Sequence, residues 1–144
     1  MIIREMLEED AVFVAELENS IFNMNTKPSS LADECRRDNS VYIVACEGDS
    51  IIGYCTIIAS FETADLCNIA VKEDYRKQHI AEMIFEYAVK KCRAKSVERI
   101  LLEVRESNTP AILFYDKIHF EKIGMRKNYY SNPSENALIL QKSI

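Results

Sequence analysis

The chain has 144 residues, a length typical of one domain, and its 48% hydrophobic content is enough for a sizeable core. The net charge of −5 excludes a basic field that would hold nucleic acid, and an acidic protein of this kind suits a basic partner. The first ten residues lack the apolar core of a signal peptide, and no apolar run approaches the roughly 20 residues that cross a bilayer, so we expect one cytoplasmic domain over residues 1–144 without a membrane partner.

The first half of the chain predicts a strand, two helices and a hairpin. Residues 1–5 form a short strand, and apolar residues recur at helical spacing over residues 8–22. Pro28 and two serines open a second, shorter helix, SSLADECRRD, whose few apolar positions place it on the surface. Two β-rich runs then flank EGDS within residues 41–60, which is the pattern of a β-hairpin.

The second half predicts a crossover between parallel strands. TADLCNIAV is a strand, residues 80–95 follow the helical period, and ERILLEVRE is another strand. This strand, loop, helix, strand order makes the two strands parallel and adjacent or nearly so. A short helix over Thr109–Ile118 and strands near residues 120–125 and 137–141 complete a mixed sheet, so the fold class is α/β. Two stretches look irregular, NMNTKPSS and NYYSNPSEN.

The cysteines indicate neither a disulfide framework nor a metal site. They are odd in number, form no CxxC pair and lie mostly in apolar runs: Cys35, Cys46, Cys55, Cys67 and Cys92. The two histidines, His79 and His119, cannot be placed beside any of them from the sequence. We therefore expect the cysteines to be small core residues in a reducing cytosol, and we expect no metal cofactor.

The basic stretch RKQHIA, from Arg76 to Ala81, lies at the predicted start of a helix. The first turn of a helix offers about four unpaired N–H donors and the positive end of the helix dipole, which together bind phosphate. Arg76 and Lys77 add positive charge, and His79 is a further donor. Glycine is usual in such a turn because a pyrophosphate approaches closely and some residues take φ > 0, yet this stretch contains none. The alternative is that RKQH is the solvated start of an amphipathic helix.

Three stretches together resemble the GNAT acetyltransferase superfamily: NIAVKEDYRKQHIAEMIFEYAV, LLEVRESNTPAILFYDKIHF and RKNYY. Within it they resemble the bacterial RimI type, which acetylates the N-terminal alanine of ribosomal protein S18. The resemblance implies a mixed, mostly antiparallel sheet whose one parallel strand pair splays around acetyl-CoA, the cosubstrate. The family pattern Arg/Gln-x-x-Gly-x-Gly/Ala falls on Arg76, His79 and Ala81, so His79 departs from it. His119 also stands where relatives have glycine.

Acyl transfer from a thioester to an amine needs a base for the amine and an acid for the departing thiolate. Glu103 interrupts the apolar run ILLEV, and strand alternation puts it on the face of Leu101 and Arg105. By resemblance Glu103 is the general base, acting through a water; the alternative is a strand-end carboxylate paired with Arg105 or another cation. By resemblance Tyr115 is the general acid, and the alternative is a core aromatic whose hydroxyl reaches water. We expect both side chains to face one cleft.

The resemblance also implies residues that bind the two substrates. Asn108 hydrogen bonds the pantetheine arm, although its role as the N-cap of the following helix would alone explain it. A strand edge pairs with pantetheine and the basic turn holds the pyrophosphate; these cofactor-binding residues are Ile69, Ala70, Val71, Arg76, Lys77, Gln78, His79, Ile80 and Ala81. The segment RKNYY grips a peptide through Arg126, Asn128, Tyr129 and Tyr130, unless the two tyrosines merely cover the edge of the core.

The predicted acceptor is a protein N-terminus, and two alternatives stay open. An α-amino group with a pKa near 7.7–8 is about a tenth neutral at pH 7, whereas a lysine with a pKa of about 10.4 is neutral in fewer than about one molecule in a thousand. This difference favours N-terminal acetylation, and the acidic composition suits the basic tail of a ribosomal protein. The first alternative is a GNAT enzyme that acts on a small amine or a lysine. The second is a GNAT-shaped binding module that has lost cofactor affinity through His79.

Overall fold

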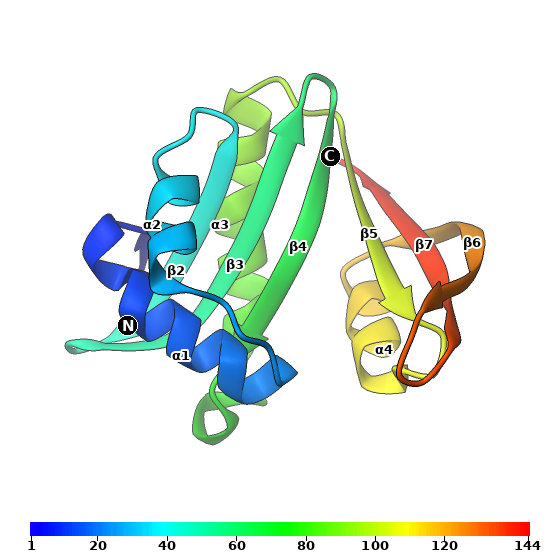
Figure 1. Cartoon of the computed structure of the whole chain (residues 1–144). Helices are drawn as coiled ribbons and strands as arrows, with labels where there is room; N and C mark the ends of the chain where they lie inside the picture. Colours follow the sequence, from blue (N-terminus) through cyan, green and yellow to red (C-terminus); the bar gives the residue numbers. More distant parts are fainter.

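The computed structural model describes residues 1–144 and consists of a seven-stranded mixed sheet with helices on both faces (Figure 1). In chain order the elements are β1 (Ile2–Glu5), η1 (Glu8–Asp10), α1 (Ala11–Phe22), α2 (Pro28–Cys35), β2 (Ser40–Glu47), β3 (Ser50–Ser60), β4 (Thr63–Val71), η2 (Glu73–Tyr75), α3 (Ile80–Ala94), β5 (Arg99–Arg105), α4 (Thr109–Lys117), β6 (Glu121–Tyr130) and β7 (Glu135–Ser143). The elements η1 and η2 are single 3-10 turns. None of the helices has the length and apolarity that a bilayer-spanning helix requires.

The sheet has the strand order β1-β2-β3-β4-β5-β7-β6, and every neighbouring pair is antiparallel except β4 and β5. The crossover through α3 connects these two parallel strands, as the sequence predicts. Their pairing is short, because it joins only Thr63–Asp65 to Arg99–Leu101. Beyond this point the strands diverge (Figure 1), so the mostly antiparallel sheet with one splayed parallel pair is confirmed.

Two hydrophobic cores lie on the two faces of the sheet. Helices α1 and α2 pack on one face, where Val14, Val44 and Tyr54 are buried. Helix α3 packs on the other face, where Ile57 and Ile84 are fully buried. Two periodicities of the sequence produce this arrangement, since apolar residues recur at helical spacing in α3 and alternate along the strands.

Burial along β5 alternates from residue to residue, as strand geometry requires. Leu102 and Val104 are buried in the core under α3, whereas Leu101, Glu103 and Arg105 are half-buried on the other face. The predicted division of these five residues between two faces is therefore confirmed. Glu103 is set in the open part of the strand, beyond the last residue that pairs with β4.

Two segments differ from the sequence prediction. Helix α2 ends at Cys35 and is shorter than the predicted SSLADECRRD. Residues 128–130, predicted to be irregular, continue β6, and only residues 131–134 connect it to β7. The strand tolerates this polar run because the β6–β7 register shifts between Arg126 and Tyr130, and Asn128 takes φ of 52° there while its N–H donates to Asn136 Oδ1 at 3.0 Å.

Candidate functional site

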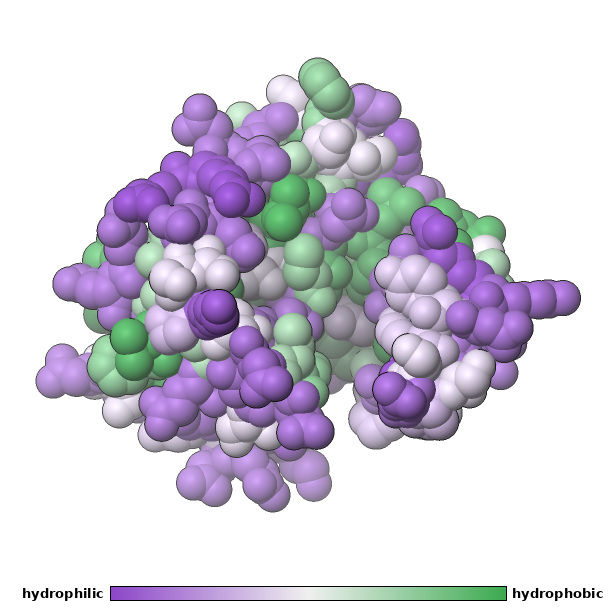
Figure 2. Space-filling view, viewed as in Figure 1, coloured by the Kyte–Doolittle hydropathy of each residue, from purple (hydrophilic) through white to green (hydrophobic).

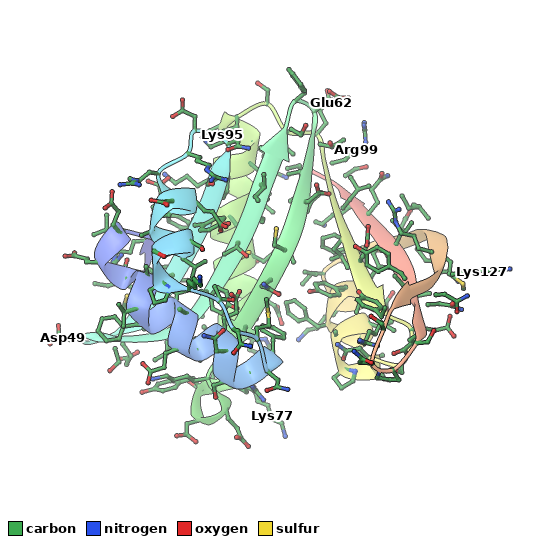
Figure 3. The ribbon with its side chains drawn as sticks, in the orientation of Figure 1. Asp49, Glu62, Lys77, Lys95, Arg99 and Lys127 are labelled. Atoms are coloured by element: carbon green, nitrogen blue, oxygen red, sulfur yellow. The ribbon has the colours of Figure 1, made fainter.

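The divergence of β4 and β5 leaves a hollow between the two halves of the sheet (Figure 2). Figure 3 shows Glu62 and Arg99 at the end where the strands meet and Lys77 at the opposite, open end. Three cavities are lined by the strands, helices and turns around this opening. We call them the turn pocket, the strand-edge pocket and the carboxylate pocket.

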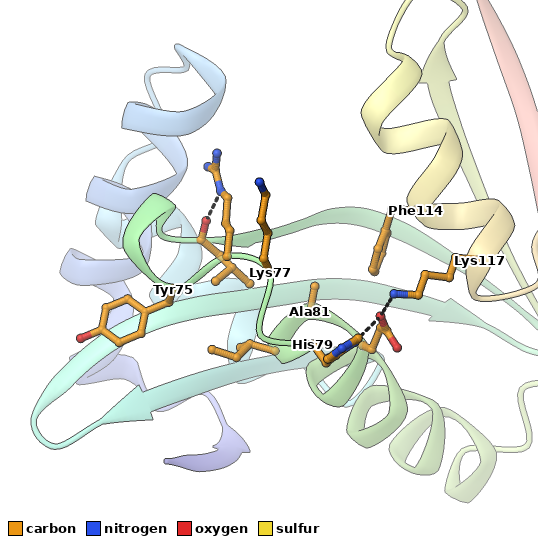
Figure 4. Close-up of a pocket in the computed structure, with 10 residues that line it drawn as sticks. Tyr75, Lys77, His79, Ala81, Phe114 and Lys117 are labelled. Carbon is orange, nitrogen blue, oxygen red and sulfur yellow. Dashed lines mark hydrogen bonds and ion pairs between the residues drawn. The ribbon is translucent and has the colours of Figure 1, made fainter.

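The turn pocket has a volume of about 400 Å³ and lies at the start of α3 (Figure 4). It is lined by Val71, Tyr75, Arg76, Lys77, His79, Ile80, Ala81, Glu82, Phe114 and Lys117. Helix α3 begins at Ile80, and its first turn hydrogen bond runs from the Met83 N–H to the His79 carbonyl at 3.1 Å. The N–H groups of the first helical residues have no intrahelical acceptor, so this pocket offers donors and a helix dipole to an anion.

The turn adopts left-handed backbone geometry without glycine. Lys77 has φ of 62° and His79 has φ of 60°, a region that costs a non-glycine residue roughly 1–2 kcal/mol. The His79 side chain is 70% exposed, and its Nδ1 lies 3.1 Å from Glu82 Oε1 (Figure 4). The imidazole is thus held beside the first turn of α3 by a side chain of the helix.

Charged side chains of the turn pocket come from three elements. Arg76 Nε donates to the Val71 carbonyl at 2.9 Å, which fixes the stem of this side chain against the end of β4. Lys117 of α4 reaches across to Glu82 of α3, with 2.7 Å between Nζ and Oε1 (Figure 4). The hydrogen bonds from Lys117 and then His79 lower the pKa of Glu82. Cations outnumber carboxylates here, although the whole protein has a net charge of −5.

The strand-edge pocket, about 410 Å³, adjoins the turn pocket and shares four of its lining residues, Val71, Arg76, Ala81 and Phe114. Ile69 and Ala70 line it from β4, and Asn108 and Tyr115 line it from the N-cap and the last turn of α4. This part of β4 has no strand partner on the β5 side, because β4–β5 pairing ends at Asp65. The pocket can therefore receive an extended chain that hydrogen bonds to a free strand edge.

Asn108 caps α4 as predicted, and its Oδ1 accepts the Ala111 N–H at 3.3 Å. Tyr115 on the same helix is 9% exposed, and its ring packs edge-on against Phe114 and Phe120 at centroid distances of 5.5 Å. Burial raises the pKa of Tyr115 well above its usual value. Its phenol is consequently protonated at physiological pH.

The carboxylate pocket, about 520 Å³, lies between the first half of β4 and the end of β5. It is lined by Asp65, Leu66, Cys67, Leu101, Leu102, Glu103, Arg126, Tyr129, Tyr130 and Ile139. Glu103 Oε1 lies 3.1 Å from Arg126 Nε, whereas its Oε2 is buried without a hydrogen-bond partner. A buried carboxylate oxygen that accepts no hydrogen bond costs folding free energy. This atom is therefore available to accept a hydrogen bond from a ligand or a water.

Tyr129, Tyr130 and Arg126 line the carboxylate pocket together with Glu103. The nearby Glu103 carboxylate raises the pKa of Tyr129, and the Arg126 guanidinium lies 5.7 Å from the Tyr129 ring centroid. Arg105 instead pairs with Glu135 at 3.2 Å and lies 4.3 Å from the Tyr130 ring centroid. The cation that pairs with Glu103 is therefore Arg126, because Arg105 is already engaged.

Comparisons with known proteins agree on one family. Residues 5–120 match the profile described as "Acetyltransferase (GNAT) family". A Bacillus subtilis protein named provisionally as a ribosomal protein bS18-alanine N-acetyltransferase is 38% identical over 143 residues, which cover 99% of this chain and 95% of that protein. The chain belongs to the GNAT acetyltransferase family.

Other members show the same name or the same fold. The ribosomal protein bS18-alanine N-acetyltransferase of Haemophilus ducreyi is 35% identical over 97 residues, 65% of this chain and 67% of that protein. The crystal structure of Ard1 from Thermoplasma volcanium superposes with a TM-score of 0.88 at 26% identity, covering 99% of this chain and 97% of that chain. The crystal structure of the ribosomal-protein-S18-alanine N-acetyltransferase from Escherichia coli superposes with a TM-score of 0.87 at 23% identity, covering 99% and 93%.

In this GNAT protein the structure brings most of the predicted site residues to the opening. Tyr115 lines the strand-edge pocket and Glu103 lines the carboxylate pocket, which are two parts of this opening, and the expectation that both face one cleft stays a prediction. The two pockets share β4 as a wall. Gln78 and Asn128 line none of the three pockets, and Asn128 instead forms the irregularity in β6.

Sequence reasoning missed Lys117 and Glu82, which face each other across the turn pocket. A cation in the last turn of α4 and a carboxylate in the first turn of α3 are ordinary helix-end residues, so each has an explanation without a site. Only the approach of α4 to the start of α3 shows that they meet.

We predict that His79→Gly raises the free energy of unfolding by less than about 1 kcal/mol, because glycine takes φ > 0 without a Cβ penalty. Calorimetric titration with acetyl-CoA, the acyl donor of GNAT enzymes, should give an affinity within about threefold of the parent, since the imidazole is exposed and bonded to Glu82. His119→Gly is the matched control, because His119 has φ of 72° but lies outside the turn pocket. Binding by the glycine variant alone would contradict this geometry.

Proposed function

We propose that this protein is an acetyl-CoA-dependent N-alpha-acetyltransferase that acetylates a protein N-terminus, with the N-terminal alanine of ribosomal protein S18 as its acceptor. One observation carries the proposal. The unpaired edge of β4 runs from the cationic turn pocket, through the strand-edge pocket, to the carboxylate pocket. In the carboxylate pocket one oxygen of Glu103 has no hydrogen-bond partner. Relatives named for this reaction, including one that matches 99% of the chain, support the choice of acceptor. With this acceptor, we expect the enzyme to act in the cytoplasm.

The residues of two pockets fit the chemistry of acetyl-CoA, a thioester on a long polar arm that ends in phosphates. The pyrophosphate would accept hydrogen bonds from the backbone N–H groups at the start of α3, beside Arg76 and Lys77. The amides of pantetheine would pair with the main chain of Ile69–Val71 and with Asn108. Because the turn and strand-edge pockets share four lining residues, one extended ligand would occupy both.

Glu103 is the proposed general base. The attack of the acceptor nitrogen on the acetyl carbon forms the amide bond, and the amine loses a proton to a water held by Glu103. The unpartnered Oε2 is the free acceptor for that water, because Oε1 is engaged by Arg126. An α-amino group with a pKa near 7.7–8 needs only this modest base.

Tyr115 is the proposed general acid. As the carbon–sulfur bond breaks, the electron pair goes to sulfur, and the Tyr115 phenol donates its proton to the thiolate. Burial raises the pKa of Tyr115, and the same low-dielectric surroundings would raise the pKa of a thiol placed beside it. The proton donor and its acceptor thus shift in the same direction, and transfer between them stays feasible.

The acceptor peptide would enter the carboxylate pocket. Tyr129 and Tyr130 stand edge to face at 5.0 Å beside Glu103 and present apolar rings with polar edges to an extended peptide. Asp65 and Glu103 line the pocket with negative charge that attracts an ammonium group before it is deprotonated. The position of Tyr129 and Tyr130 in a pocket favours a binding role over a simple cover for the core.

The alternative of an inactive binding module depends on His79 blocking the coenzyme. His79 lines the turn pocket, but its side chain is 70% exposed and lies 3.1 Å from Glu82, an arrangement that favours an unobstructed site; the titration of His79→Gly with acetyl-CoA tests it. The alternative acceptors, a small amine or a lysine, differ from an N-terminus in pKa and in the need for a peptide groove.

We predict that Glu103→Gln lowers kcat for peptide acetylation by about 100-fold, the usual contribution of a general base, and leaves the Kd for acetyl-CoA within about twofold. Thiol release measured with a saturating peptide gives kcat, and calorimetry gives Kd. Glu106→Gln is the control for loss of a charge, because Glu106 is an exposed residue just beyond β5. Equal rates for the two variants would remove Glu103 from the mechanism.

We predict that Tyr115→Phe lowers kcat by at least about tenfold, because the phenol proton is lost while the packed ring is kept. Single-turnover rates measured beside Tyr87→Phe, a hydroxyl deletion on α3 away from the three pockets, isolate the effect. An unchanged rate for Tyr115→Phe would assign proton donation to another group or to water.

The acceptor is tested by a panel assayed at equal concentration: a peptide with the N-terminal sequence of S18, the same peptide with a blocked N-terminus and an internal lysine, a polyamine and free alanine. We expect acetylation of the first peptide to exceed the others by at least about tenfold, because only it combines a low-pKa amine with groove contacts. Faster acetylation of the blocked peptide or of the polyamine would overturn the proposed acceptor.

A further inference from the structure

Glu18 of α1 is a buried carboxylate that the proposed mechanism does not use. Glu18 is 3% exposed, and its carboxylate accepts three hydrogen bonds from neutral donors. Oε1 accepts from the Tyr54 hydroxyl at 3.0 Å and from Asn68 Nδ2 at 2.8 Å, and Oε2 accepts from Thr26 Oγ1 at 2.5 Å. Burying a carboxylate is costly unless it accepts hydrogen bonds. Loss of any of these three bonds would therefore be unfavourable, and the bonds restrain the three donor side chains.

The three donors come from three parts of the fold, and they depend on Glu18 unequally. Thr26 lies between α1 and α2, and it is also held by Asn19, which accepts its N–H at 2.7 Å and donates to its carbonyl at 3.0 Å. Asn68 lies on β4, and its side chain makes no hydrogen bond other than that to Glu18. Thr26 is therefore held by Asn19 as well as by Glu18, whereas the Asn68 side chain is held by Glu18 alone.

Asn68 lies in the part of β4 that is least supported by the sheet. On one side, pairing with β5 ends at Asp65. On the other side, the register with β3 shifts, because Thr56 pairs with Asn68 while Ile57 pairs with Leu66, and Cys67 is left as an extra residue. Such a bulge bends the strand and re-aims the residues beside it. The bond between Glu18 and Asn68 pins this bulge to α1.

The bulge is also the junction between two pockets. Cys67 lines the carboxylate pocket that contains Glu103, and Ile69 lines the strand-edge pocket that contains Tyr115. Asn68 stands between them in sequence. The direction that β4 takes at this residue fixes how the two pockets are placed relative to each other.

We propose that Glu18 is a positioning residue for acyl transfer: by holding Asn68 it sets the β4 bulge, and with it the alignment of the acetyl group in one pocket with the acceptor amine in the other. This inference rests on the proposed acetyltransferase function. It concerns alignment, so it predicts an effect on turnover more than on coenzyme affinity, since a misplacement of about 1 Å can cost about 100-fold in rate.

Asn68→Leu and Thr26→Val form a matched pair, because each removes one donor to Glu18 without a large change in side-chain volume. We expect Asn68→Leu to lower kcat by about 30-fold with the Kd for acetyl-CoA within about threefold, and Thr26→Val to keep kcat within about twofold. Glu18→Gln should keep kcat within about threefold, because its amide oxygen still accepts from Asn68 and Tyr54. Equal kcat for Asn68→Leu and Thr26→Val would overturn the proposal.

Hydrogen–deuterium exchange of residues 66–70 provides a readout that needs no acceptor. Asn68→Leu should speed exchange in this segment by about tenfold or more while Thr26→Val leaves it unchanged. Unchanged exchange in both variants would overturn the anchor whatever the activity. If the parent failed to acetylate the S18 peptide while exchange responded as expected, the proposed acceptor would be wrong and the anchoring of the bulge would stand.

Discussion

The early end of the β4–β5 pairing is the constraint on which the rest of the molecule depends. After Asp65 and Leu101 the two strands separate, and β5 continues in register with β7 over its whole length. The sheet thus consists of two well-paired halves that share one short junction. Backbone groups on the β5 side of β4 lose their natural partners there, and polar backbone groups need hydrogen bonds from water or from a ligand. A ligand that resembles a strand, with amides along an extended arm, satisfies this need.

The opening also separates charge. Its outer end, at the start of α3, gathers Arg76, Lys77 and Lys117, while the pocket between the first half of β4 and the end of β5 contains Asp65 and Glu103. Phosphates and an ammonium group would therefore be attracted to different ends of the opening. Glu82 and Arg126 moderate the two ends, because Glu82 pairs with Lys117 and Arg126 pairs with Glu103. These two ion pairs partly neutralise the charge of each pocket in the free protein. They therefore reduce the repulsion among like charges within each pocket before a ligand binds.

Local periodicity predicted the elements, the crossover and the two faces of β5, because these depend on neighbouring residues. What the sequence could not show depends on register between distant segments. Arg126 rather than Arg105 meets Glu103 because β6 pairs with β7 and Glu135 of β7 takes Arg105. The bulge at Cys67 arises from one unmatched residue in the β3–β4 register, which no composition signal marks. The places of Glu103 and Tyr115 within the opening depend on the same three-dimensional pairing.

Left-handed turns without glycine recur through the chain and explain how the turn before α3 can lack it. Only Gly48 among the three glycines has positive φ, whereas eight other residues adopt it, including Lys77, His79 and His119. Three of the eight are asparagines, which tolerate this region, and each of the other five is strained by roughly 1–2 kcal/mol in the folded state. A side chain also restricts the unfolded chain, which recovers about 0.4–1 kcal/mol relative to glycine. The net penalty per turn is small, and the burial of Ile80 and Ile84 in the first turns of α3 is sufficient to hold the geometry that presents the N–H groups.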